Sequence, residues 1–204
     1  MAKLSHVVTG TVRLSYCNLT KPFARDGQEP KYSTTILVPK TDTDTMQRIY
    51  AAMEVAKQEG AQKIWGGMPP SVATPVHDGD GARPSDGQPF GAECKGHFVL
   101  TASSKNRPEL VDANMNPIIN ENEVYGGMLA RVSFDFFPYA NSGRKGVGCG
   151  LGNVMKIADA EPFGNRTTAA SDFSTPGAAA PAQGYGAYTS APAPQIYPIT
   201  GLPM

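Results

Sequence analysis

Hydrophobic and polar residues alternate along residues 7–16, which is the pattern of a β-strand with one buried face. The buried face of this strand is expected to carry Val8, Val12, Leu14 and Tyr16. An Asp26-Gly27 turn separates it from a second alternating stretch at residues 31–38, which Pro39 ends. The buried face of the second strand is expected to carry Tyr32, Ile36 and Val38. Together the two stretches predict a hairpin.

One stretch has helical periodicity instead. Apolar residues recur three or four positions apart at Met46, Ile49, Tyr50 and Met53. Asp42 or Thr43 can cap the N-terminus of this helix, and Gly60 is the expected stop. The pattern therefore predicts a single helix after the first hairpin.

The second half of the chain returns to strands. Residues 66–94 are rich in Gly, Pro and Asp and predict a long loop, residues 97–103 predict a strand, and a polar insertion runs to about Tyr125. Two long strands follow at 128–139 and 146–157. Their buried faces are expected to carry Met128, Ala130, Val132, Phe134 and Phe136 in the first, and Val147, Cys149, Leu151, Met155 and Ile157 in the second.

The order of these elements indicates a mainly β fold. Five strands and one helix in the order β-β-α-β-β-β fit an OB-fold-like, partly open five-stranded Greek-key barrel with long loop insertions. The helix comes one strand earlier than in a minimal OB-fold, so we expect the first strand to bend and count twice. An α+β sandwich is the alternative.

A change of composition near residue 165 marks the end of the folded part. From Phe173 to Met204 the chain has no charged residue, and Ala, Pro, Gly, Ser and Thr dominate. Such a segment cannot bury enough apolar surface to offset the entropy lost on ordering. We therefore expect an OB-fold-like domain over 1–164 and a disordered Ala/Pro/Gly-rich tail over 165–204.

The net charge does not announce a nucleic-acid partner, because 18 Lys and Arg balance 18 Asp and Glu. The balance is uneven, however: residues 1–40 carry six basic and two acidic residues, and residues 109–130 carry four acidic residues and no basic one. The three cysteines are too few for a disulfide framework and are expected to be reduced. Without an apolar signal core or a span of about 20 apolar residues, a soluble protein of the host cytoplasm with no membrane contact is expected.

The candidates for catalysis and metal binding are weak. His77 lies near Asp78, Asp80 and Asp86, which would suit a metal-dependent nuclease, but Asp is also common in Gly-bearing turns. Cys94 and His97 are only half of a zinc site. Residues 112–123 have the ligand spacing of a calcium loop, with Pro117 where that loop needs Gly. We expect no enzyme activity, no catalytic residues, no metal and no cofactor.

Alternating glycines at Gly146, Gly148, Gly150 and Gly152 strip one face of the last strand of side chains. They do not form a nucleotide-binding turn, since they lie within a strand and Asn153 stands where a third Gly would be needed. Two interpretations remain open: close approach of a base and sugar, or tight closure of the barrel.

Aromatic and basic residues mix at three strand ends, as in proteins that bind single-stranded nucleic acid with a basic groove and stacking platforms. The candidate DNA-binding residues are Arg13, Lys21, Phe23, Arg25, Lys31, Lys105, Arg107, Phe137, Tyr139, Arg144 and Lys145. Phe137 and Tyr139 share the polar face of their strand with Arg131 and Ser133.

Several stretches resemble a family of tailed-phage single-stranded DNA-binding proteins, formerly catalogued as a domain of unknown function. They include Lys63-Ile64-Trp65-Gly66-Gly67, His77-Asp78-Gly79-Asp80 and residues 32–40, 96–105, 125–128, 145–154 and 159–164. The set is specific, although no single piece is a mechanistic motif. The resemblance covers essentially all of 1–164.

The resemblance implies an OB-fold core, sequence-independent binding of single-stranded DNA, and a role in phage DNA replication or recombination. Its implied partners are single-stranded DNA and phage replication or recombination proteins, and a homodimer stays open. Many proteins of this function end in an acidic tail that binds partners, whereas this tail is uncharged after Asp172. The alternative function is that of a virion structural or scaffold protein, since such proteins are also near-neutral, Gly-rich and β-rich.

Overall fold

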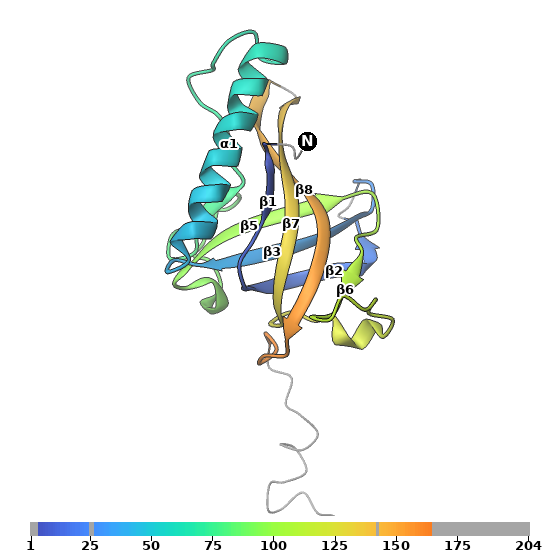
Figure 1. Ribbon diagram of the computed structural model, residues 1–204. Helices are drawn as coiled ribbons and strands as arrows, with labels where there is room; N and C mark the ends of the chain where they lie inside the picture. Colours follow the sequence, from blue (N-terminus) through green and yellow to red (C-terminus); the bar gives the residue numbers. More distant parts are fainter. Residues whose placement is uncertain (1–3, 25–26, 142, 165–204) are drawn as a thin grey trace, which may run out of the picture. The chain divides into compact units, whose positions relative to one another are not determined.

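A computed structural model describes residues 4–24, 27–141 and 143–164. The elements run in the order β1 (His6–Val8), β2 (Val12–Phe23), β3 (Lys31–Pro39), α1 (Thr43–Lys63), β4 (Val76–Asp78), β5 (His97–Ser104), β6 (Leu110–Val111), β7 (Leu129–Asn141) and β8 (Arg144–Ala158), with short 3-10 turns at Ala92–Cys94 and Glu121–Glu123. Figure 1 shows the strands wrapped around one another, with α1 along one side. The predicted tail and its boundary at residue 165 lie outside the described residues.

Five strands close a barrel in the order β2-β3-β5-β8-β7, because β7 pairs with both β8 and β2. All neighbours are antiparallel except β5 and β8, which are parallel and share the single register pair Ser103↔Gly150. In ring order the strands read first, second, third, fifth, fourth, which is the topology of an OB-fold. The predicted fold class is therefore confirmed, and the α+β sandwich is wrong.

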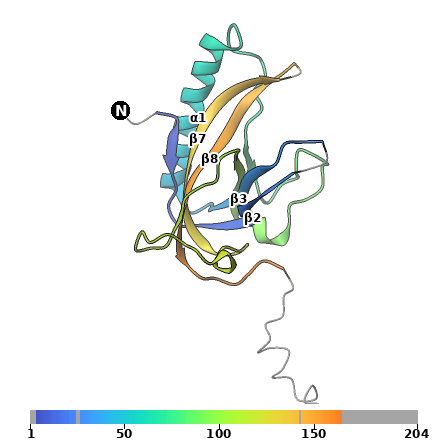
Figure 2. The same ribbon diagram turned by 90° about the vertical axis from the view of Figure 1, so that its right-hand side faces the viewer.

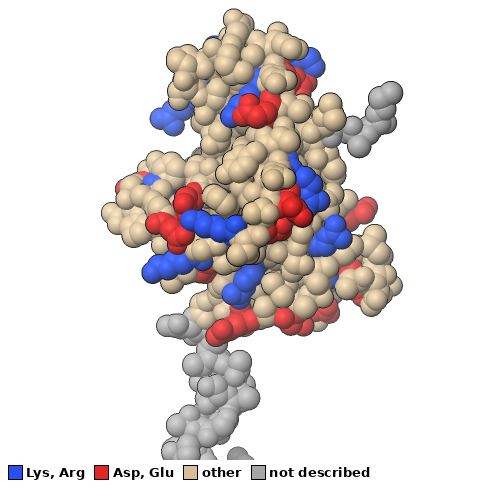
Figure 3. All heavy atoms as spheres, turned by 60° about the vertical axis from the view of Figure 1, so that its left-hand side comes forward, with Lys and Arg blue, Asp and Glu red and all other residues tan. Residues whose placement is uncertain are grey.

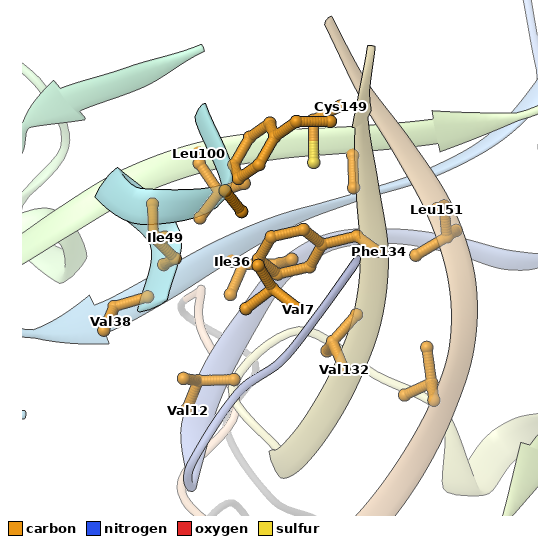
Figure 4. Packing of buried hydrophobic residues seen from close by; sticks show 14 of the residues in the cluster. Val7, Val12, Ile36, Val38, Ile49, Leu100, Val132, Phe134, Cys149 and Leu151 are labelled. Atoms are coloured by element: carbon orange, nitrogen blue, oxygen red, sulfur yellow. The ribbon is translucent and has the colours of Figure 1, made fainter. Parts of the chain in front are cut away.

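The barrel interior is a cluster of buried aliphatic and aromatic side chains. Phe134 and Phe136 of β7 are fully buried, and their rings pack edge to face with 5.4 Å between the ring centroids. Ile49 of α1 is fully buried in the same cluster, as Figure 4 shows. The helix thus closes one side of the barrel, and the predicted inward face of residues 128–136 is confirmed.

The first alternating stretch is two strands rather than one. β1 pairs with β7 outside the ring, while β2 enters it. The strand is interrupted around Gly10, where a Cβ would come within 2.7 Å of the Asp42 carboxylate at the start of α1. The break shifts the alternation, so Val7 is buried and Val8 is exposed, opposite to the prediction. The helix still lies between the second and third strands of the ring.

Asp42 is the N-cap of α1, because its carboxylate accepts a hydrogen bond from the Thr45 amide at 3.0 Å. The predicted stop at Gly60 is wrong, since the helix continues to Lys63. Gly60 is buried instead: a Cβ there would come within 2.7 Å of both Trp65 and Pro138. Glycine at this position permits close packing rather than ending the helix.

The loops contain more structure than their composition suggests. Within the predicted loop 66–94, β4 pairs with β5, and within the polar insertion β6 pairs with β8. A bulge between β7 and β8 also changes the inward face of β8. Val132 lies opposite Val154 and Phe134 opposite Leu151, so Val154 is buried where Met155 was expected.

Candidate nucleic-acid interface

A trough of about 620 Å³ lies on the outer face of β2, β3 and β5. Small polar residues of the three strands line it, namely Ser15, Asn18, Ser33, Thr35, Thr101 and Ser103. They alternate with the buried residues of the barrel and therefore face outward. The Thr35 and Thr101 hydroxyls lie 3.2 Å apart across β3 and β5, and the Asn18 amide donates to the Ser33 hydroxyl at 3.3 Å. This surface offers hydrogen-bonding groups without fixed charge.

Two segments enclose the trough. One is the end of the β2–β3 hairpin, which contributes Phe23, Gln28, Glu29 and Lys31. The other is the loop between β4 and β5, which contributes Arg83, Ser85, Phe90, Glu93 and Cys94. Figure 2 shows the β2–β3 hairpin extending away from the rest of the barrel. The loop wall is anchored from below, because Phe90 packs against a small buried cluster of Leu37, Cys94 and Val99.

The trough combines exposed aromatic rings with cations. Tyr16 is 71% exposed and Phe23 is 57% exposed. Lys31 and Arg83 line the trough, and Arg83 pairs with Asp86 at 3.1 Å. Lys105 pairs with Glu29 on the hairpin, which holds the pKa of that carboxyl below its usual range. Cationic and anionic groups are therefore interspersed here, as Figure 3 also shows for one face of the molecule.

Among the described residues that were predicted to bind, only Phe23 and Lys31 line the trough. Arg13, Lys21, Arg107 and Arg144 are four of those that do not. The Arg13 guanidinium donates to the carbonyls of Gly127 at 3.1 Å and Glu161 at 2.5 Å, and lies 4.2 Å from the centre of the Phe163 ring. Arg13 thus fastens the end of the described chain to β2. Of the other three, Lys21 forms an exposed ion pair with Glu121. Arg107 is exposed after the end of β5, and Arg144 is exposed at the start of β8. Arg25 lies outside the described residues.

Phe137 and Tyr139 lie over the alternating glycines of β8. A Cβ at Gly148 would come within 2.5 Å of the Phe137 ring, and one at Gly146 within 2.6 Å of the Tyr139 hydroxyl. Aromatic side chains of the neighbouring strand β7 therefore fill the space above these two glycines, which neither of the two open interpretations described. Phe137 remains 44% exposed. Lys145 donates to the Trp65 carbonyl at 2.8 Å, so this cation is tied to the end of the α1 segment.

The trough and Phe137 belong to one continuous outer surface. Ser103 in the trough is paired with Gly150, and Gly148, two residues earlier on β8, is paired with Phe137. Gly150 has no side chain, and a Cβ at this position would lie 3.6 Å from the same ring. Neighbouring strands are about 4.8 Å apart, so Phe137 is about two strand spacings, roughly 10 Å, from β5.

Sequence reasoning missed several residues of the trough. The alternating pattern of residues 7–16 assigns Tyr16 to the core, so it could not predict that this ring is exposed. Arg83 and Phe90 lie in a loop without periodicity, so no pattern marks them. The alternation of β3 does assign its small polar residues to the outer face, but nothing in the sequence indicates that β5 lies beside them to complete the trough.

The candidate nuclease and metal residues are occupied by other interactions. The Lys40 ammonium lies 2.6 Å from a carboxylate oxygen of both Asp78 and Asp80, and these contacts lower the pKa of each carboxyl. In the part of the chain that the structure describes, no three His, Cys, Asp or Glu side chains come together as metal ligands would. None of the described helices is long and apolar enough to cross a membrane.

Comparison with known proteins identifies similar chains. Residues 5–183 match the family model described as the ssDNA-binding protein of Enterobacter phage Enc34. Protein p50 of Acyrthosiphon pisum secondary endosymbiont phage 1 is 30% identical over 162 residues, which is 74% of this chain and 83% of that protein.

Solved structures are similar as well. The single-stranded DNA-binding protein from bacteriophage Enc34 in complex with ssDNA is 30% identical, with a TM-score of 0.68 over 79% of this chain and 91% of that chain. Gp2.5, a single-stranded DNA-binding protein encoded by bacteriophage T7, is 15% identical, with a TM-score of 0.53 over 79% of this chain and 90% of that chain. The second likeness concerns the fold alone.

Proposed function

The chain belongs to the family of the single-stranded DNA-binding protein of Enterobacter phage Enc34, and on that premise we propose that it binds single-stranded DNA without sequence preference in the trough. The observation that carries the proposal is the position of the trough. It lies on the first three strands of the ring and beside the loop between the first two, and so includes the face of the second and third strands that OB-folds use for oligonucleotides.

The chemistry of the trough suits a ligand whose sequence varies. Every base has an aromatic face, so exposed rings such as Tyr16 and Phe23 can stack on any of them. Hydroxyl groups both donate and accept hydrogen bonds, so the polar strand residues tolerate different base edges. Lys31 and Arg83 supply charge for phosphates. The family is one of binding proteins and not of enzymes.

We extend the proposed path beyond the trough to Phe137. A DNA strand that runs from Ser103 across Gly150, which has no side chain, would reach the Phe137 ring without meeting a side chain from β8. Arg144 and Lys145 lie further along the same pair of strands. We place the activity in phage DNA replication or recombination, in the cytoplasm of the infected host. The family assignment favours this function over a virion structural role.

A salt titration tests the function. Binding of a labelled oligo(dT), followed by fluorescence anisotropy, should weaken linearly on a log–log plot, by about 0.7 per phosphate contacted. Lys31→Ala should reduce the magnitude of that slope by about 0.7, the value for one phosphate contact, because it removes a cation from the trough. Lys63→Ala is the matched control, since it removes the same charge from the exposed end of α1.

Two outcomes would contradict different parts of the proposal. Absence of salt-dependent affinity for any single-stranded oligonucleotide would exclude the function. Normal binding by both Lys31→Ala and Phe23→Ala would leave the function standing and exclude the trough as its site.

A further inference from the structure

A bulge in β2 turns the side chain of Tyr16 out of the barrel. Ser15 is paired with Thr35 and Asn18 with Ser33, so β2 uses one residue more than β3 over this stretch. Leu14 and Leu19 on either side are fully buried, whereas Tyr16 is 71% exposed and lines the trough. An unbroken alternation would have placed this ring in the core beside Leu14.

The backbone of Tyr16 is in an unfavourable conformation. Its φ is +49°, in the left-handed region where a Cβ crowds the following carbonyl oxygen. The only other non-glycine residue with positive φ among the described residues is Met115, in an exposed turn. Because the Tyr16 ring is mostly exposed, its burial contributes little to offset this strain. Strain of this kind persists where the surroundings fix it, and it is concentrated at functional sites.

Neighbouring groups hold the bulge from both sides. On the β3 side, the Thr34 hydroxyl donates to the Ser15 carbonyl at 3.2 Å. The Asn18 amide lies 3.4 Å from the Tyr16 carbonyl, which it can bond alongside Ser33. On the other side, the Cys17 thiol donates to the Tyr125 carbonyl at 3.4 Å. The conformation is therefore set before any ligand arrives.

We infer that Tyr16 is a pre-organised stacking platform for a base of the bound strand, held outward by this bulge. The inference rests on the proposed function and adds to it how one of the stacking rings is held in place before DNA binds. Tyr16 and Phe23 both line the trough from β2, so they supply two rings along one strand of the barrel. A platform fixed in advance loses little side-chain freedom when a base stacks on it.

Substitution by glycine separates the binding role from a structural one. Tyr16→Gly relieves the positive φ, so its melting temperature should equal or exceed that of the wild type. Its affinity for oligo(dT) should nevertheless fall by about 5- to 150-fold, the range expected for loss of one stacked base. Tyr16→Phe keeps the ring and should bind within about twofold of wild type. Tyr50→Ala removes a half-exposed tyrosine from α1 and should not change affinity.

A cross-linking experiment gives a readout that does not depend on stability. Oligo(dT) carrying 5-iododeoxyuridine, irradiated in complex with the wild-type chain, should yield a cross-linked peptide that contains Tyr16. Wild-type affinity in Tyr16→Gly, or a fall in its melting temperature that accounts for the lost affinity, would overturn the inference. If Phe23→Ala weakens binding while Tyr16→Gly does not, the inference fails and the proposed function stands. If the wild type binds no oligonucleotide, both fail.

Discussion

At the scale of single residues, the same strand gives neighbouring aromatic side chains opposite roles. Phe134 and Phe136 point into the barrel and are fully buried, whereas Phe137 lies on the outer face over Gly148. Their difference follows from the two-residue period of a strand and not from their chemistry. Tyr16 shows how one inserted residue can reverse that assignment.

Paired substitutions on β7 measure this difference. Phe134→Ala should lower the free energy of unfolding by about 3–5 kcal/mol, because it leaves a cavity in a packed core. Phe137→Ala should cost about 1 kcal/mol or less, since it removes a partly exposed cross-strand contact. Urea denaturation gives both values. Where both variants are folded, the affinity for oligo(dT) should fall in Phe137→Ala and stay unchanged in Phe134→Ala. Equal destabilisation by the two variants would contradict the assignment of faces.

At the scale of elements, the wall of the trough depends on how one loop is fastened to the barrel. Lys40 follows β3, and its ammonium joins the two carboxylates of Asp78 and Asp80 at the end of β4. The second Asp80 oxygen accepts the Gly96 amide at 3.0 Å, just before β5 begins. These contacts tie the two ends of the loop 79–96 to the end of β3, so they position Arg83 and Phe90 beside the trough.

The stability contributed by this ion cluster should depend on pH. The lowered pKa values of Asp78 and Asp80 mean that their contribution is present above the ordinary carboxyl range and is lost as pH falls through the lowered values. The raised pKa of Lys40 means that its contribution is lost only as pH rises above the ordinary lysine range. The full contribution is therefore present at neutral pH.

Lys40→Met should accordingly lower the urea midpoint at neutral pH, and the difference from wild type should shrink at the acidic limit of the folded range. Lys63→Met is the control, because its partner Glu59 is on the same helix. A difference that does not change between neutral and acidic pH would show that Lys40 acts through its cation–π contact with Phe98 rather than through the two carboxylates.

The elements that the sequence predicts well are those with long, regular alternation. The two final strands are predicted almost to their ends, because Val132, Phe134 and Phe136 keep their period without interruption. A bulge on β8 turns Val154 inward in place of Met155. In the first alternating stretch, the errors arise where one residue changes the register, at Gly10 and at the Tyr16 bulge. Such breaks depend on contacts with Asp42, Thr34 and Tyr125. Those residues are distant in sequence, so local periodicity could not reveal them.

At the scale of the whole molecule, the candidate site is assembled from segments far apart in the chain. The β2–β3 hairpin, the loop before β5 and the strand β5 meet because β3 pairs with both β2 and β5. Sequence analysis found Phe23 and Lys31 within one hairpin, but it could not join them to Arg83. A near-neutral chain can still present a binding surface in this way, since a few cations and rings gather in one trough.

The end of the described chain allows a test of where the folded domain stops. Residues 159–163 cross back over β2: the Tyr125 hydroxyl donates to Asp159 at 2.8 Å, and the Phe163 amide donates to the Gly126 carbonyl at 2.8 Å. Together with the contacts of Arg13, they form a strap that ends at Gly164. Truncation after Gly164 removes none of these contacts, so the melting temperature should stay close to that of the full chain.

Truncation after Ala158 should have a different result, because it removes the whole strap. The strap supplies one hydrogen-bond acceptor and an aromatic ring to the Arg13 guanidinium, and it also bonds Tyr125 and Gly126. Their loss is worth about 2–4 kcal/mol, which for a domain of this size lowers the melting temperature by about 5–10 °C. Both variants can be compared with the full chain by circular dichroism and by salt titration of oligo(dT). The chain ending at Gly164 should keep the salt slope of the full chain, since the removed residues 165–204 carry only Arg166 and Asp172, whose charges cancel. If that variant unfolds or changes its slope, residues beyond 164 belong to the folded or binding part of the molecule. If the shorter variant melts with the full chain, the strap does not contribute to stability.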